Sequence, residues 1–589
     1  MIRRPPSPAW PLRTLVVLGV LGALLCVSGR TPAGAQVPGE LVPLDAFARG
    51  VEASAVAPIR PGPRLVVAML FDQYRDDLLD RYRPVFGSDG LRRILDEGSR
   101  FRDCTIPYVP TLTGPGHATW LTGAPPSSHG IVANEWYEPR ENRYVAAAED
   151  RSVKPIGIEG TGEPASPQRL RVQSVADALR GATHGAGRVI AVSDKARGAV
   201  LAGGRRPNGV YWLDAASGLM QTSTYYTSAL PPWAEQANIA RRAKVEAARR
   251  EPWTALLPPE AYLGTISADP TDAFPHSVVT GPEDTRPGTL GLQLHPFALD
   301  GLFDFAEAAV AGEGLGADEI PDLLIVSVSI TDLVGHQFGP DSPEALDLAA
   351  RLDRRVAAFL RVLDQRVGRG RYTISITADH GVSPAPRVAR LFETGPADSV
   401  GGLGGTWLNA WIDSTLIKAA GSKATGLKAF ARAVGSGLVH FDDEVLGKAG
   451  LTRRQAARIL ADSARTNPYL ASGYPAEDLA GVRVLDAVGQ KVRAGFDPYR
   501  SGDLVLVTKP YAFFGTGRTL RTSHGTPYRY DAHVPFVLWG YGIKKGTIWQ
   551  PVSTVDIAPT ISAILGVDSP AQAEGRVLFE AFGPKLLDR

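Results

Sequence analysis

The clearest pattern along the chain is a series of uninterrupted apolar runs, each followed closely by an acidic residue. Residues 65–71 (LVVAMLF) end at Asp72, residues 322–330 lead to Asp332, and residues 372–377 lead to Asp379. Continuous apolar runs of this length are typical of parallel strands that are buried on both faces. Ligand sites of open α/β sheets lie beyond the carboxyl ends of the strands, so we expect the three acids on one rim of a sheet.

Amphipathic stretches separate these runs and predict the helices that cover such a sheet. They lie at residues 91–98, 173–180, 297–310, 344–367 and 555–565, and further strands are predicted at 188–193, 503–508 and 534–539. The chain shows no repeat period. This alternation predicts an α/β fold, a three-layer α/β/α sandwich around a mostly parallel sheet.

Two irregular, Pro- and Gly-rich regions interrupt the alternation, at residues 198–296 and 388–500. In the second region we predict a strand at 407–412 and helices at 424–434 and 453–466. Long regions without the alternation of strands and helices seen in the core are interpreted as inserted caps. The catalytic core is then expected in three parts, at residues 64–197, 297–387 and 501–589.

The N-terminus carries the features of a signal peptide. Residues 1–35 contain Arg3 and Arg4, an uncharged run at 15–27 and a small-residue cleavage site at 33–35. The run is too short for a comfortable membrane span, so a periplasmic or secreted protein with no stable span after signal removal is expected. Twin-arginine export and a lipoprotein site at Cys26 are weaker alternatives. Residues 36–63 are interpreted as an extended lead-in.

The composition of the chain limits the partners that it can bind. The 589 residues are 44% hydrophobic and 21% charged, as in a large globular protein, and the formal net charge of +2 offers no broad basic field. We therefore expect no nucleic-acid polymer as partner, and only local recognition of phosphate. After signal removal Cys104 is the single cysteine, which excludes an internal disulfide.

Residues 108–136 contain a threonine, Thr113, at a position where the chain is predicted to turn sharply. Thr113 is followed by Gly-Pro-Gly, and residues 117–121 predict a short helix whose free N–H groups would face an anion. A later turn returns Asn134 toward the same place. A plain Pro/Gly-rich surface loop is the alternative. No Ser/His/Asp arrangement surrounds Thr113, so a metal is the expected activator.

Carboxylates and imidazoles at suitable spacings supply two ligand sets. One set is predicted from Asp332, His336 and His524, and the other from Asp72, Asp379 and His380 together with the oxygen of Thr113. Such mixed ligands fit zinc best, and manganese and cobalt accept the same residue types. Taken singly, each of these acids is more simply explained as a cap of a turn or helix than as a metal ligand. His117 and the remaining histidines are assigned structural roles. The combination favours a two-metal site.

These motifs resemble the alkaline phosphatase superfamily and, within it, the PafA-like bacterial phosphatases with a threonine nucleophile. The matching segments are Phe71-Asp72-Gln73, Thr113-Gly-Pro-Gly-His117, residues 129–134 (HGIVAN), Ser193-Asp-Lys195-Ala-Arg197, Thr331-Asp332 with His336, Ala378-Asp379-His380-Gly381 and Ser523-His524-Gly525. The resemblance spans roughly residues 66–578.

The resemblance implies two zinc ions per chain in the two ligand sets, and phosphate contacts from Asn134, Lys195 and Arg197. It favours Thr113 over Thr111 as the nucleophile. The implied reaction is hydrolysis of small phosphate monoesters through a covalent phosphothreonine.

Other members of the superfamily are weighed against this reading. A sulfatase needs a Cys-x-Pro-x-Arg setting, which Cys104-Thr-Ile-Pro107 does not provide, and the export signal speaks against a cytoplasmic phosphoglycerate mutase. A nucleotide pyrophosphatase/phosphodiesterase is the serious alternative. An inactive homologue that acts as a binding protein is the alternative of another class.

Overall fold

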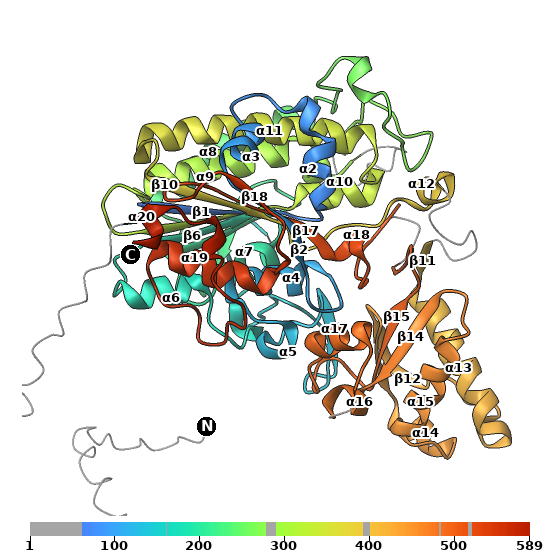
Figure 1. Ribbon diagram of the computed structural model, residues 1–589. Coiled ribbons are helices and arrows are strands. Elements are labelled where there is room, and N and C mark those ends of the chain that lie inside the picture. The colour runs from blue at the N-terminus through green and yellow to red at the C-terminus, as the bar shows by residue number, and fades with distance from the viewer. Residues whose placement is uncertain are drawn as a thin grey trace, which may run out of the picture. The chain divides into compact units, whose positions relative to one another are not determined.

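The computed structural model describes residues 62–160, 162–278, 290–392, 401–481, 484–515 and 521–588 (Figure 1). The predicted signal peptide and all but the last two residues of the lead-in lie outside these residues. Among the described helices, none combines the length and the apolar character that crossing a membrane requires.

One large mixed sheet forms the centre of the described chain. Its strand order is β18-β2-β17-β10-β1-β9-β6-β7-β8-β5, with β19 paired to β2. The strands are β1 (Leu65–Phe71), β2 (Ser99–Thr105), β5 (Pro155–Ile156), β6 (Val189–Ser193), β7 (Gly209–Leu213), β8 (Met220–Ser223), β9 (Asp322–Val328), β10 (Tyr372–Thr377), β17 (His533–Gly540), β18 (Gly546–Ile548) and β19 (Val552–Ser553). The middle of the sheet, from β10 through β1, β9 and β6 to β7, is parallel.

The apolar runs occupy this parallel centre because neither of its faces meets water. All seven residues of β1 and all seven of β9 are buried. Burying a Val, Leu or Phe side chain contributes about 1.5–3 kcal/mol, so these runs hold the centre of the sheet in place. The strands predicted at residues 65–71, 188–193, 322–330 and 372–377 are therefore confirmed, the third with an earlier end.

Helices cover both faces of the sheet (Figure 1). One layer contains α2 (Asp76–Arg81), α3 (Leu91–Glu97), α8 (Pro232–Ala248), α9 (Phe297–Gly312), α10 (Ile330–Phe338) and α11 (Pro343–Leu363). The opposite layer contains α4 (Thr113–Thr122), α5 (Pro126–His129), α6 (Val175–Ala182), α7 (Ala196–Gly203) and α19 (Ile557–Leu565). The expected three-layer sandwich is confirmed.

The first region predicted as an insertion contributes to the central sheet. Strands β7 and β8 lie within residues 198–296 and continue the sheet beyond β6. The rest of that region supplies α8 and a long irregular segment. The sequence missed this continuation because the two strands are short and follow a Gly- and Pro-rich stretch.

The second region forms a separate small sheet with its own apolar core. The sheet order is β12-β13-β15-β14, from β12 (Ala431–Gly435), β13 (Leu438–Phe441), β14 (Leu470–Pro475) and β15 (Leu504–Thr508). Its helices are α13 (Gly405–Ala420), α14 (Asp443–Lys448), α15 (Arg453–Ala464), α16 (Ala476–Ala480) and α17 (Ala487–Gly495). The strand predicted at 503–508 is confirmed, but it belongs to this sheet and not to the central one.

Two predictions inside this region are wrong. Residues 407–412 lie in helix α13, where Leu408, Ile412 and Leu416 are buried at helical spacing and Trp407 and Trp411 stack on each other. Residues 424–434, predicted as a helix, end in strand β12. In both places short apolar runs carried too little periodicity to separate helix from strand.

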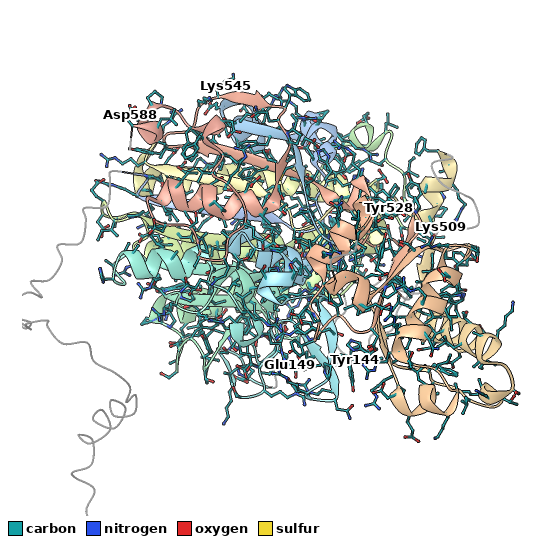
Figure 2. The ribbon with its side chains drawn as sticks, turned by 60° about the horizontal axis from the view of Figure 1, so that its bottom comes forward. Tyr144, Glu149, Lys509, Tyr528, Lys545 and Asp588 are labelled. Atoms are coloured by element: carbon teal, nitrogen blue, oxygen red, sulfur yellow. The ribbon has the colours of Figure 1, made fainter. Side chains whose placement is uncertain are left out.

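Hydroxyl groups of tyrosines join the second region to the core. The hydroxyl of Tyr144, on β4 (Arg143–Ala146), accepts the N–H of Val434 at 2.9 Å, and the hydroxyl of Tyr528 donates to the carbonyl of Thr508 at 2.8 Å. Figure 2 shows both tyrosines where the core meets the second region. The region is thus hydrogen-bonded to the core at two places.

The remaining elements are short. They are β3 (Glu135–Glu138), which pairs with β4, β11 (Gly401–Leu403), which pairs with β16 (Ala512–Phe514), α12 (Pro386–Leu391), α18 (Arg529–Ala532) and α20 (Pro584–Leu587). The domain boundaries proposed from the sequence stay predictions.

Candidate metal centre and nucleophile

The three strand-end acids lie on one rim of the sheet. Strand β1 is flanked by β9 and β10, and all three run parallel, so their carboxyl ends meet at the same edge. Asp72 follows β1 directly, Asp332 lies in the first turn of α10 after β9, and Asp379 lies two residues beyond β10. The spatial neighbourhood expected from the apolar runs is therefore present.

One group on this rim is formed by Asp332, His336 and His524. His336 Nε2 lies 3.1 Å and His524 Nε2 lies 3.6 Å from Asp332 Oδ1. Asp332 and His336 lie one turn apart on α10, while His524 comes from the segment that precedes α18. One ligand atom from each residue lies within 4.8 Å of the others, so the three could hold one metal ion.

The second group contains Asp72, Asp379 and His380, and the Thr113 hydroxyl stands beside it. His380 Nε2 lies 3.4 Å from Asp72 Oδ1, 3.5 Å from Asp379 Oδ2 and 3.3 Å from Thr113 Oγ1. The two groups adjoin, because the rings of His380 and His524 stack with centroids 3.5 Å apart. Thr113 thus borders the second group, which itself adjoins the first through the stacked histidines.

The histidines all present the same ring nitrogen to the centre. His336 Nδ1 lies 2.7 Å from the carbonyl of Thr522, His380 Nδ1 lies 2.9 Å from that of Gly381, and His524 Nδ1 lies 2.8 Å from that of Thr111. A carbonyl can only accept, so each Nδ1 carries the proton and each Nε2 keeps a lone pair. Backbone partners of this kind fix metal-binding histidines in their ligating tautomer.

Two buried carboxylate oxygens support the fit of a cation. Among the described residues, Asp72 Oδ1 has no hydrogen-bond partner and Asp379 Oδ2 has none nearer than His117 Nδ1, at 3.1 Å, although both side chains are buried. A buried carboxylate oxygen without a donor is costly, and coordination of a cation removes that cost. The donor set of carboxylate and imidazole suits zinc.

Comparisons with known proteins agree with this geometry. Residues 66–528 match the family "Type I phosphodiesterase / nucleotide pyrophosphatase". The chain is 31% identical to alkaline phosphatase PafA of Elizabethkingia meningoseptica over 89% of its own length and 95% of that protein's. It is 32% identical to alkaline phosphatase PhoV of Synechococcus elongatus over 88% of its own length and 92% of that protein's.

The crystal structure of wild-type PafA superposes with a TM-score of 0.80 at 30% sequence identity, covering 89% of this chain and 99% of PafA. The chain belongs to the PafA-like phosphatases of the alkaline phosphatase superfamily. The resemblance read from the motifs is confirmed.

Lys195 and Asn134, two of the phosphate-binding candidates of this PafA-like phosphatase, contact the ligand groups and the residue after Thr113. Lys195 Nζ lies 2.8 Å from Asp72 Oδ2 and 2.6 Å from Asp332 Oδ2, so its ammonium group sits between the two ligand groups. Arg197, two residues on in α7, has a buried Nε without a hydrogen-bond partner. Asn134 Oδ1 accepts the N–H of Gly114 at 2.6 Å, beside Thr113.

The helix after the nucleophile differs from the expectation. Helix α4 begins at Thr113 itself rather than at His117. The N–H of Gly114 is bound by Asn134, Pro115 has none, and the N–H of Gly116 donates to the carbonyl of Leu112. The expected anion site at the free amides of a helix that begins at His117 is therefore wrong, because those residues lie inside α4.

The hydroxyl of Thr111, the alternative nucleophile, is hydrogen-bonded to the backbone. Its Oγ1 donates to the carbonyl of Thr526 at 2.9 Å and the residue is fully buried. This geometry favours Thr113 as the reactive hydroxyl of this PafA-like phosphatase.

The sequence assigned no role to Gln73, which contacts both ligand groups. Its Nε2 donates to Asp332 Oδ1 at 2.7 Å and its backbone N–H to Asp379 Oδ1 at 3.1 Å. Its φ of 63° is in the left-handed region, which costs of order 1–3 kcal/mol for a residue with a side chain. The one available signal was a polar residue directly after a strand-end acid.

His117 contacts the backbone of Thr113 and the carboxylate of Asp379. Its Nδ1 lies 3.0 Å from the carbonyl of Thr113 and 3.1 Å from Asp379 Oδ2, and its Nε2 lies 2.7 Å from Ser327 Oγ. It takes no part in either ligand group, as expected. Its position four residues after Thr113, one helical turn away, is the signal that links the two.

The carboxylates of the two groups titrate differently. Burial raises the pKa of Asp379 to about 7, and the adjacent Asp72 acts in the same direction. Burial also acts to raise the pKa of Asp332, but His336 and Lys195 outweigh it and hold that pKa well below its usual range. A cation entering the Asp379 group near neutral pH would therefore displace a proton.

Proposed function

We propose that this chain is an exported, zinc-dependent alkaline phosphatase that hydrolyses small phosphate monoesters through a covalent intermediate on Thr113. The observation that carries the proposal is the position of Thr113 Oγ1, 3.3 Å from His380 Nε2 in one of two adjoining groups of metal-ligand side chains. A hydroxyl needs such an environment to act as a nucleophile.

Each ligand residue has a place in the proposal. Asp332, His336 and His524 would hold one zinc ion, and Asp72, Asp379, His380 and Thr113 would hold the other. Two such ions stabilise the attacking and leaving oxygens of an in-line displacement. Gln73 and His117 would fix the orientation of the carboxylates through the contacts described above.

The remaining side chains would hold the phosphoryl group while the Thr113 oxygen attacks phosphorus. Lys195 supplies a point charge, Arg197 a planar fork and Asn134 an amide, which together suit the non-bridging oxygens. A solved variant of PafA is changed at a threonine, an asparagine, a lysine and an arginine, in the same chain order as Thr113, Asn134, Lys195 and Arg197. This correspondence supports the assignment.

Export to the periplasm or out of the cell is part of the proposal. It rests on residues 1–35, whose charge, apolar run and small-residue site are those of a signal peptide.

A phosphodiesterase or nucleotide pyrophosphatase is the second candidate, because the matching family is named for those activities. An inactive binding protein is less well supported, because neither ligand group lacks a member.

Initial rates on a panel of phosphate monoesters, a phosphodiester and a sulfate ester, with zinc measured on the same preparation, test the proposal. We expect monoesters to be preferred, Thr113→Ala to lose nearly all turnover and Thr111→Ala to keep most of it. Thr113→Ser should keep substantial activity, since an alkoxide oxygen is retained. Phosphorylation of Thr111 on a trapped intermediate, or full activity after exhaustive metal removal, would contradict the assignment.

A further inference from the structure

The loop that carries Asn134 is packed against the second region. Helix α17 of that region packs against α5, the short helix that precedes the loop (Figure 1). Residues 131–133, which lead to Asn134, are 0% exposed and share an apolar cluster with Val492 and Phe496. The position of a proposed phosphate contact therefore depends on residues that lie far along the chain.

Arg500, between α17 and β15, contacts the chain on both sides of Asn134. Its Nη1 donates to the carbonyl of Gly130, before Asn134, and to the carbonyl of Arg169 at 3.0 Å. Its guanidinium group lies over the ring of Trp136, after Asn134, at 5.0 Å from the centroid. One side chain thus joins the second region to residues 130–136.

The guanidinium group of Arg500 is a buried cation. Its side chain is 11% exposed, and Glu138 Oε2 lies 3.7 Å from its Nε. Burial lowers the pKa of Arg500 to about 10, so the group keeps its charge at neutral pH. A buried cation is costly without acceptors, and the two carbonyl groups are therefore held close to it.

The backbone around Arg500 is fixed to the same loop. Asp497 is 1% exposed, its Oδ1 accepts the N–H of Arg500 at 3.1 Å, and its Oδ2 pairs with Arg171. The N–H of Arg171 donates to the carbonyl of His129 at 3.1 Å. A Cβ at Gly130 would lie 2.8 Å from Nη1 of Arg500 and 2.9 Å from Cδ of Arg171, so only glycine leaves room for both side chains.

The side-chain amide of Asn134 has a fixed orientation in this arrangement. Its Oδ1 accepts the N–H of Gly114 at 2.6 Å, so its NH2 group is the end that is left to donate to a phosphate oxygen. A hydrogen bond weakens steeply when donor and acceptor move out of line. A shift of residues 130–136 would therefore weaken the contact between Asn134 and phosphate.

We propose that Arg500 is a positioning residue, which holds residues 130–136 so that the Asn134 amide meets the phosphoryl group of the substrate. The inference rests on the proposed function, because that function assigns Asn134 to the phosphate. The second region then acts on the reaction through Asn134, without Arg500 itself touching the substrate.

A double-mutant cycle on the full metal-loaded protein tests this role. We expect Arg500→Met to lower kcat/KM for p-nitrophenyl phosphate about tenfold, the scale of one hydrogen bond to a charged group. In the Asn134→Ala background the same change should cost less than about twofold, because the contact that Arg500 positions is already gone. Equal losses in both backgrounds, or no loss while Asn134 is present, overturn the proposal.

Arg493→Met is the matched control. Arg493, on α17, also donates to two carbonyls, but these belong to Asp478 and Leu479 of the second region itself. It should keep kcat/KM within about twofold of wild type, and a loss equal to that of Arg500→Met would overturn the proposal. Arg500→Lys keeps the charge without the planar fork, so it should lose less than Arg500→Met, and it replaces that variant in the cycle if Arg500→Met does not fold.

Hydrogen–deuterium exchange gives a measurement that does not depend on the reaction. The amides of residues 130–136 should exchange faster in Arg500→Met than in wild type, and at the wild-type rate in Arg493→Met. Unchanged exchange in Arg500→Met would mean that Arg500 does not hold the loop, whatever ester the protein hydrolyses. If exchange rises but Asn134→Ala keeps full activity, the hold on the loop stands and the proposed role of Asn134 falls.

Discussion

Removal of the charged side chains of Lys195 and Arg197 is expected to separate monoester from diester hydrolysis. Lys195 Nζ contacts Asp72 and Asp332, one carboxylate from each ligand group, and its side chain is 10% exposed. The buried Nε of Arg197 has no partner among the described residues. The double change Lys195→Ala, Arg197→Ala therefore removes two positive charges from the rim that would receive the phosphoryl group.

The size of the effect follows from the charges. A monoester brings a dianion whose transition state spreads charge over three oxygens, whereas a diester carries one charge fewer and a second organic group. Charge-assisted contacts contribute about 1.5–3 kcal/mol each. Lys195 is shared with two carboxylates, so we take the lower end of that range, about 3 kcal/mol for the pair. This corresponds to a loss of roughly a hundredfold in kcat/KM for the monoester.

The assay compares kcat/KM for p-nitrophenyl phosphate and bis-p-nitrophenyl phosphate in wild type and double variant. Metal content is measured on each preparation, because Lys195 touches two of the ligand carboxylates. Arg432→Ala, Lys448→Ala is the control, since it removes the same charge from exposed ion pairs of the second region. The control should leave both rates unchanged.

The monoester preference of the wild type should be large and should fall in the double variant. If the ratio of the two kcat/KM values starts near unity, or does not move on mutation, Lys195 and Arg197 do not select the dianion. The phosphodiesterase candidate would then replace the phosphatase.

Two further predictions concern metal binding and stability. Elemental analysis of the mature wild type should find about two zinc ions per chain, and His524→Ala should lose one of them preferentially; loss of both or of neither would refute the grouping with Asp332 and His336. Burial raises the pKa of Asp531 to about 7, above its unfolded value of about 4, so the folded state holds a proton that the unfolded chain releases in that window. Asp531 should therefore make the free energy of unfolding fall as pH rises from about 4 to 7, and the slope measured in denaturant titrations should be less negative in Asp531→Asn, which cannot titrate, than in wild type. An identical slope in both proteins would assign the dependence to other groups.

The pattern of apolar residues along the chain was sufficient to predict an element where both of its faces are completely buried. Strands β1, β9 and β10 were predictable because a parallel strand between two helix layers needs apolar residues at every position. The same reasoning failed at α13, where apolar residues on one face of an exposed helix were taken for a strand. It also missed β7 and β8, whose membership of the sheet depends on pairing with β6 and with each other, and not on periodicity.

The sequence by itself determined the family, the fold class and the identity of the residues that cluster around Thr113. Strand-end acids must share a rim, since parallel strands end at the same edge of a sheet. Only the tertiary structure decided how these residues are held. The backbone carbonyls that orient the three histidines, the two contacts of Gln73 and the bridging position of Lys195 all join segments far apart in the chain. Contacts of this kind are set by packing across the sheet and between its layers, and no local spacing encodes them.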